Sequence, residues 1–349
     1  MTTFYEFLAY NTFPNPRSMM DLEKTIVENN IVNMPPAGLK NFIRAQVKFG
    51  SASPETLNPI IDLLTEKKAY NDLKVNLQTI RCLTDTLHRF DDYMLHSLEA
   101  YKKEFDNQKA RGNLAIETSK KIDRSATNFF MISHFTVGNI FKIVTDYAFI
   151  HGINFTEEQV SEFAEKMPIV EEEGKRTITG TPETIEEHIY FQIIQNGLIL
   201  GRETSRANAL LSQSLITLES SSPALFNSIP ELATAKETIL SNFLEKANNR
   251  SRKAGFIARK VQESLEKAGV TTEFDYSMSP FGSLYLFDKT NKVAYDYFLP
   301  SSFIKTPEGR KLRLSYVLRN NYLNDQGISR RELTVRHFKV NEKNDERFD

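Results

Sequence analysis

Apolar residues recur at intervals of three and four positions from Ala37 to about Asn248, and short polar breaks separate the runs. This periodicity predicts amphipathic helices. At two of the breaks, Ser53 precedes a proline and Thr156 precedes two glutamates, which are signals for a capped helix start. The chain is therefore expected to be almost entirely helix and loop up to Asn248.

The helical segments recur with a spacing of about 40 residues between Phe49 and Phe90, which is typical of stacked helical-hairpin repeats. An irregular helical bundle explains the same pattern equally well. One stretch differs: "PIVEEEGKRTITGTPETIEEH", from Pro168 to His188, combines an acidic cluster with two glycines. A solvated loop is expected there, followed by a helix that begins at Thr181 or Pro182.

Beyond Gly269 the apolar residues alternate with polar ones instead of following a helical period. Three runs, "TTEFDYSMSP", "SLYLFDKT" and "KVAYDYFLP", read as strands, and they follow a basic amphipathic helix from Arg252 to Ala268. A further helix is expected in "PEGRKLRLSYVLRNNYLNDQG", with Gly327 at its end, and "ELTVRHFKV" reads as a last strand. The order is helix, three strands, helix, strand, or αβββαβ.

These patterns predict a fold of class α + α/β, in which an N-terminal helical-hairpin array precedes a small αβββαβ domain. Residues 1–36 form an N-terminal extension, residues 37–248 an α-helical, repeat-like region, and residues 249–349 the α/β module with a short charged tail.

Composition is that of an ordinary globular protein, since 40% of the 349 residues are hydrophobic and 26% are charged. No run approaches the roughly 20 uncharged apolar residues of a membrane-spanning helix. The single cysteine, Cys82, excludes an internal disulfide framework and a cysteine-rich zinc site. Neither a secretory signal nor a clear arginine-rich transit peptide is visible in residues 1–30.

The net charge of −1 conceals an asymmetry along the chain. Residues 249–340 contain 17 lysines and arginines against 9 acidic residues, a net charge of +8, whereas the tail 341–349 carries −2 and residues 1–248 carry −7. A basic module attached to acidic helices predicts that a polyanion meets the C-terminal module and that other proteins meet the helices.

The C-terminal order resembles the RAP domain, a module of organellar RNA-associated proteins that is similar in fold to the PD-(D/E)XK nuclease core of restriction endonucleases. In that family a strand ends in an acid and is followed by a Gly-Pro-Ser-His-Phe-like turn and a helix rich in leucine and arginine. Here Asp296 lies in the strand, "LPSSF" occupies the turn, and "GRKLRLSYVL" opens the helix. The resemblance covers about the last 85 residues. Leu299 stands where the family favours glycine, and Ser302 where it favours histidine.

Asp296 occupies the position of a metal-binding carboxylate in the nuclease relatives, and we interpret it as a vestige of that site. Hydrolysis would need a lysine two residues later, but Phe298 is there, and the neighbouring strand offers only Asp288 at its exit. Asp296 is then expected to cap the turn or to pair with an arginine. No histidine or cysteine spacing of a metal site and no phosphate-binding glycine motif occurs. We therefore expect no catalytic residues, no metal and no cofactor.

Basic residues are the better candidates for function, because lysine and arginine neutralise phosphates without reading sequence. One group follows Gly309 at the expected helix start, and a second lies on the preceding helix. A solvated helix face is the alternative explanation. The candidate RNA-binding residues are Lys305, Arg310, Lys311, Arg313, Arg319, Arg252, Lys253, Arg259 and Lys260.

Aromatic residues in the expected sheet offer a second way to bind single-stranded RNA, by stacking on bases. A place in the hydrophobic core is the simpler explanation for most of them. The residues are Tyr276, Phe281, Tyr285, Tyr295 and Tyr297.

The resemblance implies a non-catalytic RNA-associated protein. The expected compartment is the mitochondrion, with plastid or cytoplasm as alternatives. The expected partners are RNA, including ribosomal RNA, and other proteins. It points to a ribonucleoprotein such as the mitochondrial ribosome. A structural subunit of a large organellar complex, whose RAP-like module contacts only protein, is the first alternative, and a metal-dependent nuclease is the second.

Overall fold

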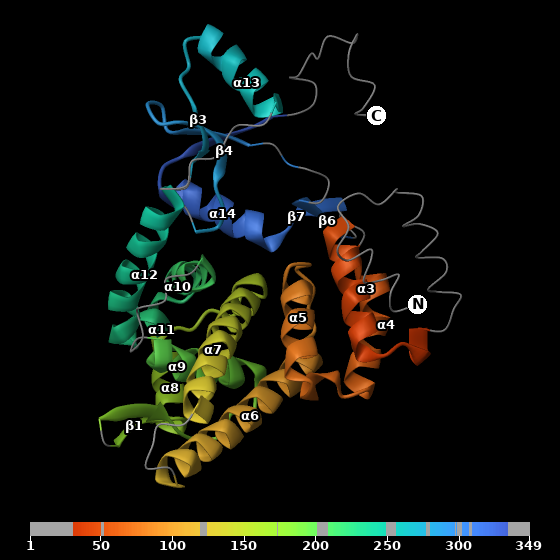
Figure 1. Cartoon of the computed structure of the whole chain (residues 1–349), viewed down its shortest axis with the longest axis vertical. Helices are drawn as coiled ribbons and strands as arrows, with labels where there is room; N and C mark the ends of the chain where they lie inside the picture. The colour runs from red at the N-terminus through yellow and green to blue at the C-terminus, as the bar shows by residue number, and fades with distance from the viewer. Residues whose placement is uncertain are drawn as a thin grey trace.

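The computed structural model describes residues 31–49, 52–118, 124–172, 174–200, 209–248, 256–276, 280–296, 298, 302–306 and 309–333. Helices predominate, and a small sheet follows them near the C-terminus (Figure 1). The N-terminal helices are α3 (Pro36–Phe49), α4 (Pro54–Glu66), α5 (Leu73–Thr84), α6 (Asp91–Thr118), α7 (Arg124–Ile150), α8 (Glu157–Lys166), α9 (Ile185–Leu200), α10 (Ala209–Ser221), α11 (Pro223–Asn227) and α12 (Pro230–Asn248), with short 3-10 turns at Ile31–Asn33 and Ala69–Asn71.

Two helix starts expected from the capping residues are confirmed. Pro54 is the first residue of α4, and the backbone N–H of Ser53 donates to Oγ1 of Thr56 at 3.1 Å. Thr156 caps α8 reciprocally: its Oγ1 accepts from the backbone N–H of Gln159, whose Oε1 accepts from the backbone N–H of Thr156. Such pairs satisfy backbone donors that a helix start otherwise leaves without partners.

One continuous hydrophobic core unites the helical region, from Leu39 in α3 to Ile239 in α12. The hairpins α3–α4 and α5–α6 follow each other as in a repeat array, but α7 contacts α5, α6, α9 and α10. In an array each hairpin contacts only its neighbours, so from α7 onward the packing is that of the bundle alternative. Among the described residues, no helix combines the length and the apolarity needed to cross a membrane.

The expectation of a solvated loop after Pro168 is wrong in part, because two strands form an antiparallel hairpin there, β1 (Ile169–Glu172) and β2 (Lys175–Ile178). In the backbone register Glu171 lies across from Arg176, and the Arg176 guanidinium pairs with Glu231 of α12. This contact ties the hairpin to the helical core and helps to stabilise a sequence that reads as a polar loop when its glutamates are considered alone.

The next helix, α9, begins at Ile185 and not at Thr181 or Pro182. Thr184 and Glu187 cap it reciprocally: Thr184 Oγ1 accepts from the backbone N–H of Glu187, and Glu187 Oε2 accepts from that of Thr184, both at 3.2 Å. The capping signal that decided this start is the pair of residues three apart.

Apart from an additional hairpin between its third strand and its second helix, the described part of the C-terminal module follows the predicted order αβββαβ. Helix α13 (Phe256–Lys267) precedes strands β3 (Glu273–Tyr276), β4 (Leu284–Asp288) and β5 (Val293–Asp296), and helix α14 (Leu314–Asp325) precedes β8 (Ser329–Glu332). The sheet order is β3-β4-β5-β8, in which β8 runs parallel to β5 and the other pairs are antiparallel. The expected sheet of four strands interrupted by one helix is present.

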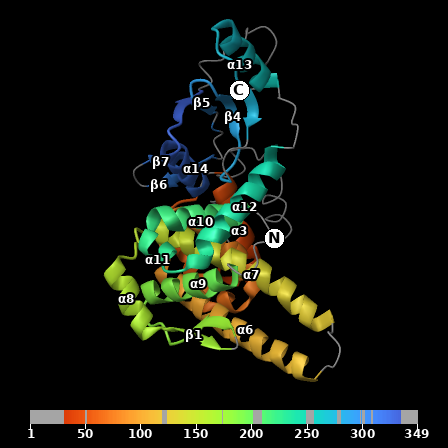
Figure 2. The ribbon, with the colours of Figure 1, turned by 90° about the vertical axis from the view of Figure 1, so that its left-hand side faces the viewer.

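The sheet lies between α13 and α14 (Figures 1 and 2). On one face Leu284, Phe287 and Ala294 pack with Leu323 of α14, and on the other Leu286 and Tyr295 pack with Val261 of α13. Each face is thus buried by one helix, which is the layered arrangement that a two-sided apolar sheet requires.

Two details of the module differ from expectation. The residues expected to open the second helix form instead a hairpin of β6 (Phe303–Thr306) and β7 (Gly309–Leu312), so α14 starts at Leu314. The last strand, expected at Glu332–Val340, lies earlier, at Ser329–Glu332. The later part of the expected strand, residues 334–340, lies outside the described residues.

Candidate functional site

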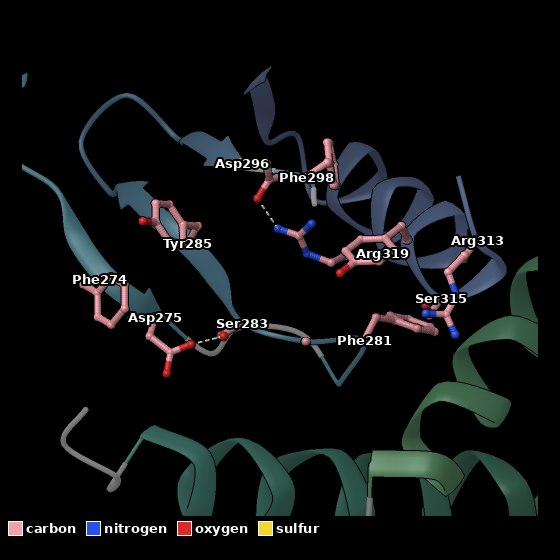
Figure 3. A pocket seen from close by; sticks show the side chains of 12 residues that line it. Phe274, Asp275, Phe281, Ser283, Tyr285, Asp296, Phe298, Arg313, Ser315 and Arg319 are labelled. Atoms are coloured by element: carbon pink, nitrogen blue, oxygen red, sulfur yellow. Dashed lines mark hydrogen bonds and ion pairs between the residues drawn. The ribbon is translucent and has the colours of Figure 1, made fainter. Parts of the chain in front are cut away.

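A pocket of about 430 Å³ lies in the C-terminal module, between strands β3, β4 and β5 and the first turns of α14 (Figure 3). Its lining combines aromatic rings with charged and hydroxyl groups. The lining residues are Phe274, Asp275, Phe281, Gly282, Ser283, Tyr285, Asp296, Phe298, Arg313, Ser315, Tyr316 and Arg319. A pocket of this size and mixed character is typical of small-ligand sites.

An ion pair forms the inner wall of this pocket. Arg319, on α14, donates a hydrogen bond from Nη2 to Oδ1 of Asp296, the last residue of β5 (Figure 3). The side chains of both residues are only 5% exposed, so the pair is almost fully removed from solvent. Leu314, Leu318 and Leu323, which anchor α14 in hydrophobic clusters, hold Arg319 in place.

The pair is not fully satisfied. Asp296 Oδ2 and Arg319 Nε are both buried and have no hydrogen-bond partner among the described residues. Removing a charge from water costs on the order of several kcal/mol per ion. Good geometry and additional hydrogen bonds are needed to offset that cost. Two unpartnered polar atoms beside a pocket are therefore a feature that stability alone does not explain.

The opposite wall comes from β3 and β4. Asp275 accepts a hydrogen bond from Ser283 Oγ and has a φ of +52°, which an L residue adopts at some cost. Its neighbours Phe274 and Tyr276 belong to different hydrophobic clusters, although residues two apart normally share a face. The irregular backbone at Asp275 accounts for this, and it leaves Phe274 beside Tyr285 with ring centroids 5.7 Å apart.

Arg313 connects the edge of the pocket to the helical region. Its Nε donates to Oδ2 of Asp85, in the turn after α5, at 2.8 Å. Beside it, Phe281 and Leu314 pack with Leu87 and Phe149 of the helical region. The pocket thus lies next to a polar and apolar contact between the two parts of the chain.

Cys82 lies close to this contact. Burial, and then the nearby Asp85 carboxylate, raise the pKa of its thiol to about 11. The thiol therefore stays protonated near neutral pH, as a structural cysteine does.

Among the described residues, the predicted basic residues lie on three elements: helix α13, the β6–β7 hairpin and the first turns of α14 with its N-cap. Arg313 and Arg319 are paired with carboxylates, whereas Lys311 on β7 and Arg259 on α13 have exposed side chains. Lys260, also exposed, pairs with Glu263 at 3.1 Å. Lys305 and Arg310 are register partners in the β6–β7 hairpin, and Arg252 and Lys253 lie outside the described residues.

The expectation that Arg310 and Lys311 form a phosphate site at a helix start is wrong. Arg310 and Lys311 lie on β7, and the residue that caps α14 is Arg313. The backbone N–H groups of α14 are therefore not next to Arg310 and Lys311, and the reasoning from the helix dipole does not apply to those two residues.

Asp296 pairs with an arginine, which is one of the two roles expected for it. Asp288, at the exit of β4, uses its Oδ1 to accept hydrogen bonds from the backbone N–H groups of Thr290 and Asn291, both at 3.0 Å. A hydrogen bond from the Asn291 side chain, and then these backbone bonds, lower the pKa of the Asp288 carboxyl. Within the part of the chain that the structure describes, no group of three or more histidine, cysteine or acidic residues is placed to hold a metal ion.

Among the aromatic candidates, Phe281 and Tyr285 line the pocket, while Tyr276 and Tyr295 pack in the core of the sheet. Tyr297 lies outside the described residues. Sequence reasoning missed Phe298 and Tyr316 as lining residues. Their rings contact each other with centroids 5.4 Å apart. No short sequence motif predicts such a contact, because the two residues are 18 positions apart in the chain.

No protein-family model matches the chain, and no curated protein matches it in sequence.

Proposed function

We propose that this protein is a non-catalytic RNA-associated protein whose C-terminal α/β module binds single-stranded RNA. The observation that carries the proposal is the pocket, where arginines and aromatic rings lie together at the position in which a RAP-like nuclease relative would hold its metal. Asp296 there is engaged by Arg319, and aromatic rings with arginine are the groups that single-stranded RNA stacks on.

Charge supports the same proposal. The module carries a net +8 over residues 249–340, and Arg330 and Arg331 on β8 have exposed side chains in addition to Lys311. The RAP-like assignment of the module, with its αβββαβ order, gives the proposal its setting: a mitochondrial ribonucleoprotein such as the ribosome, with plastid or cytoplasm as alternative compartments. Microscopy of the tagged protein beside a mitochondrial marker tests that setting.

The test of RNA binding is a titration of fluorescent single-stranded RNA with the full-length protein at several salt concentrations. Each lost phosphate contact lowers the slope of log K against log salt by about 0.7 for single strands. Two double variants, Arg310→Ala with Lys311→Ala and Arg330→Ala with Arg331→Ala, are each expected to lower it by about 1.4.

The matched control is Lys74→Ala with Lys103→Ala, which removes two exposed lysines from the acidic helical region and should leave the slope unchanged. If no RNA binds at low salt, the proposal fails. The same samples, incubated with Mg²⁺ and analysed on a gel, test for cleavage, and cleavage that disappears in Asp296→Ala would establish the nuclease alternative.

A structural role is the second candidate, and one observation favours it. Arg313 and the apolar cluster around Phe281 fix the module to the helical region, as in a subunit whose module contacts only protein. This candidate predicts that the protein purifies with other proteins after ribonuclease treatment and that none of the basic variants changes what it binds.

A further inference from the structure

We propose that the pocket binds one unstacked nucleobase of the RNA, and guanine in preference to the other bases. This inference rests on the proposed function and specifies its ligand. It follows from the shape of the pocket, from the charge of its lining and from the two buried polar atoms without partners.

The rings of the lining suit a flat ligand. Phe298 and Tyr316 stand edge to face at an interplanar angle of 87°, and Phe274 and Tyr285 stand at 76°. These rings come from the sheet on one side and from α14 on the other (Figure 3). A volume of about 430 Å³ accommodates a base with its ribose, and every base has a π face that stacks on such rings.

The charges argue against a phosphate as the occupant. Each arginine of the lining is paired with a carboxylate, Arg319 with Asp296 and Arg313 with Asp85. Asp275 adds a further acid to the lining. The two arginines of the site are therefore neutralised within the protein, and a neutral, polar, planar group fits it better than an anion.

The unpartnered atoms indicate which edge the base presents. Asp296 Oδ2 is an acceptor and Arg319 Nε–H is a donor, and neither has a partner among the described residues. Guanine presents two adjacent donors, N1–H and the N2 amino group, next to the O6 acceptor. A carboxylate and a guanidinium side by side are complementary to that edge. Both atoms are shielded from solvent, so the base reaches them when the lining side chains that cover the pair rotate away, with the Asp296–Arg319 bond kept.

The test uses fluorescein-labelled uridine nonamers that carry guanosine, adenosine, cytidine or inosine at the central position. Binding to the full-length protein is followed by fluorescence anisotropy. The guanosine nonamer is expected to bind about tenfold tighter than all-uridine RNA, and inosine, which lacks the N2 amino group, should lose most of that gain. A different preferred base, or the same affinity for all nonamers, would overturn the inference.

Variants connect the preference to the pocket. Phe298→Leu and Tyr316→Leu should each weaken the guanosine nonamer about tenfold and leave the all-uridine nonamer nearly unchanged. Phe303→Leu is the matched control, because that ring lies 6.1 Å from the Phe298 ring but is not part of the lining. A full guanosine preference in both pocket variants, with folding verified by circular dichroism, would overturn the assignment.

Two further arms separate the remaining explanations. Asp296→Asn exchanges one acceptor oxygen for a donor nitrogen and should abolish the preference for guanosine over inosine; should it fail to fold, the two aromatic variants still decide. Guanosine monophosphate is added as a competitor: competition only at millimolar concentration supports an RNA base, and competition at micromolar concentration assigns the pocket to a free nucleotide instead. If no nonamer binds at all, the proposed RNA-binding function fails as well, whereas equal binding of all nonamers overturns only the base pocket.

Discussion

Arg313, which occupies the N-cap position of α14, donates a hydrogen bond to Asp85, which lies 228 residues earlier in the chain. The two side chains are 24% and 21% exposed, so the pair is screened from much of the solvent. It joins the α/β module to the helical region at the edge of the pocket. An ion pair in such a place is expected to stabilise the contact between the two parts.

The first prediction is that this pair contributes measurably to stability. Arg313→Met and Asp85→Asn should each lower the free energy of unfolding by about 1–2 kcal/mol, because each leaves a half-buried charge without its partner. The double variant should cost less than the sum of the two. Urea denaturation followed by circular dichroism measures the four proteins of the cycle. The exposed pair Lys260–Glu263 is the control, and a coupling energy equal to that of the control would contradict the prediction.

The second prediction concerns the buried pair of Arg319 and Asp296. Arg319→Met should lower the free energy of unfolding by about 3–5 kcal/mol, since it leaves an unpaired carboxylate in the interior. Arg319→Met combined with Asp296→Leu should recover much of that loss, because two apolar groups replace two charges. Thermal and urea unfolding of both variants provide the measurement. A double variant less stable than Arg319→Met alone would show that the charges are needed for the fold itself.

The parts of the fold that follow a local rule were predictable from the sequence. The starts of α4 and α8 depend on capping residues three positions apart in the chain, and the order of the main sheet and its helices depends on the change of apolar period. The β1–β2 and β6–β7 hairpins were not predicted. Their stability comes from pairing between charged or mixed segments, which hydrophobic periodicity does not report.

The candidate site was predictable only in outline. Asp296 was identified from its place in the strand, and its pairing with an arginine was one of two expected roles. Which arginine it pairs with depends on how α14 lies against the sheet, and the sequence alone suggests a phosphate contact for Arg319. Arg313 likewise had to be located in three dimensions, because its partner Asp85 belongs to the other part of the chain.

The third prediction concerns Gly327, which ends α14 as expected, with a φ of +68°. Glycine adopts this left-handed conformation without strain, whereas other L residues do so at a cost. A Cβ at this position would meet no heavy atom within 4 Å, so only backbone strain is added. Gly327→Ala should therefore cost about 1 kcal/mol in urea unfolding. Gly327→Asn, which tolerates this conformation better, should cost less, and an equal loss in both would indicate a cause other than φ.

The fourth prediction is that stability falls as the pH is lowered below about 7, and that histidines which are partly or fully buried cause part of the fall. Burial lowers the pKa of His88, His151 and His188. In the unfolded chain these groups take up protons near the ordinary histidine pKa of about 6.5, whereas in the folded chain they resist protonation. The unfolded state therefore binds more protons as the pH falls through that value, and the free energy of unfolding decreases until the lower folded pKa is reached.

Urea denaturation at several pH values between 7.5 and 5.5 measures this effect. A double variant, His151→Gln with His188→Gln, should show a shallower fall over that range than the unaltered protein. His96→Gln is the matched control, since the His96 side chain is 44% exposed and its replacement should leave the slope close to that of the unaltered protein.

Burial raises the pKa of Asp146. This shift acts in the opposite direction, because stability from a carboxyl with a raised pKa is lost as the pH rises. Asp146 is present in all three proteins and does not affect their comparison, so equal slopes in the double variant and the unaltered protein would refute the role of these histidines.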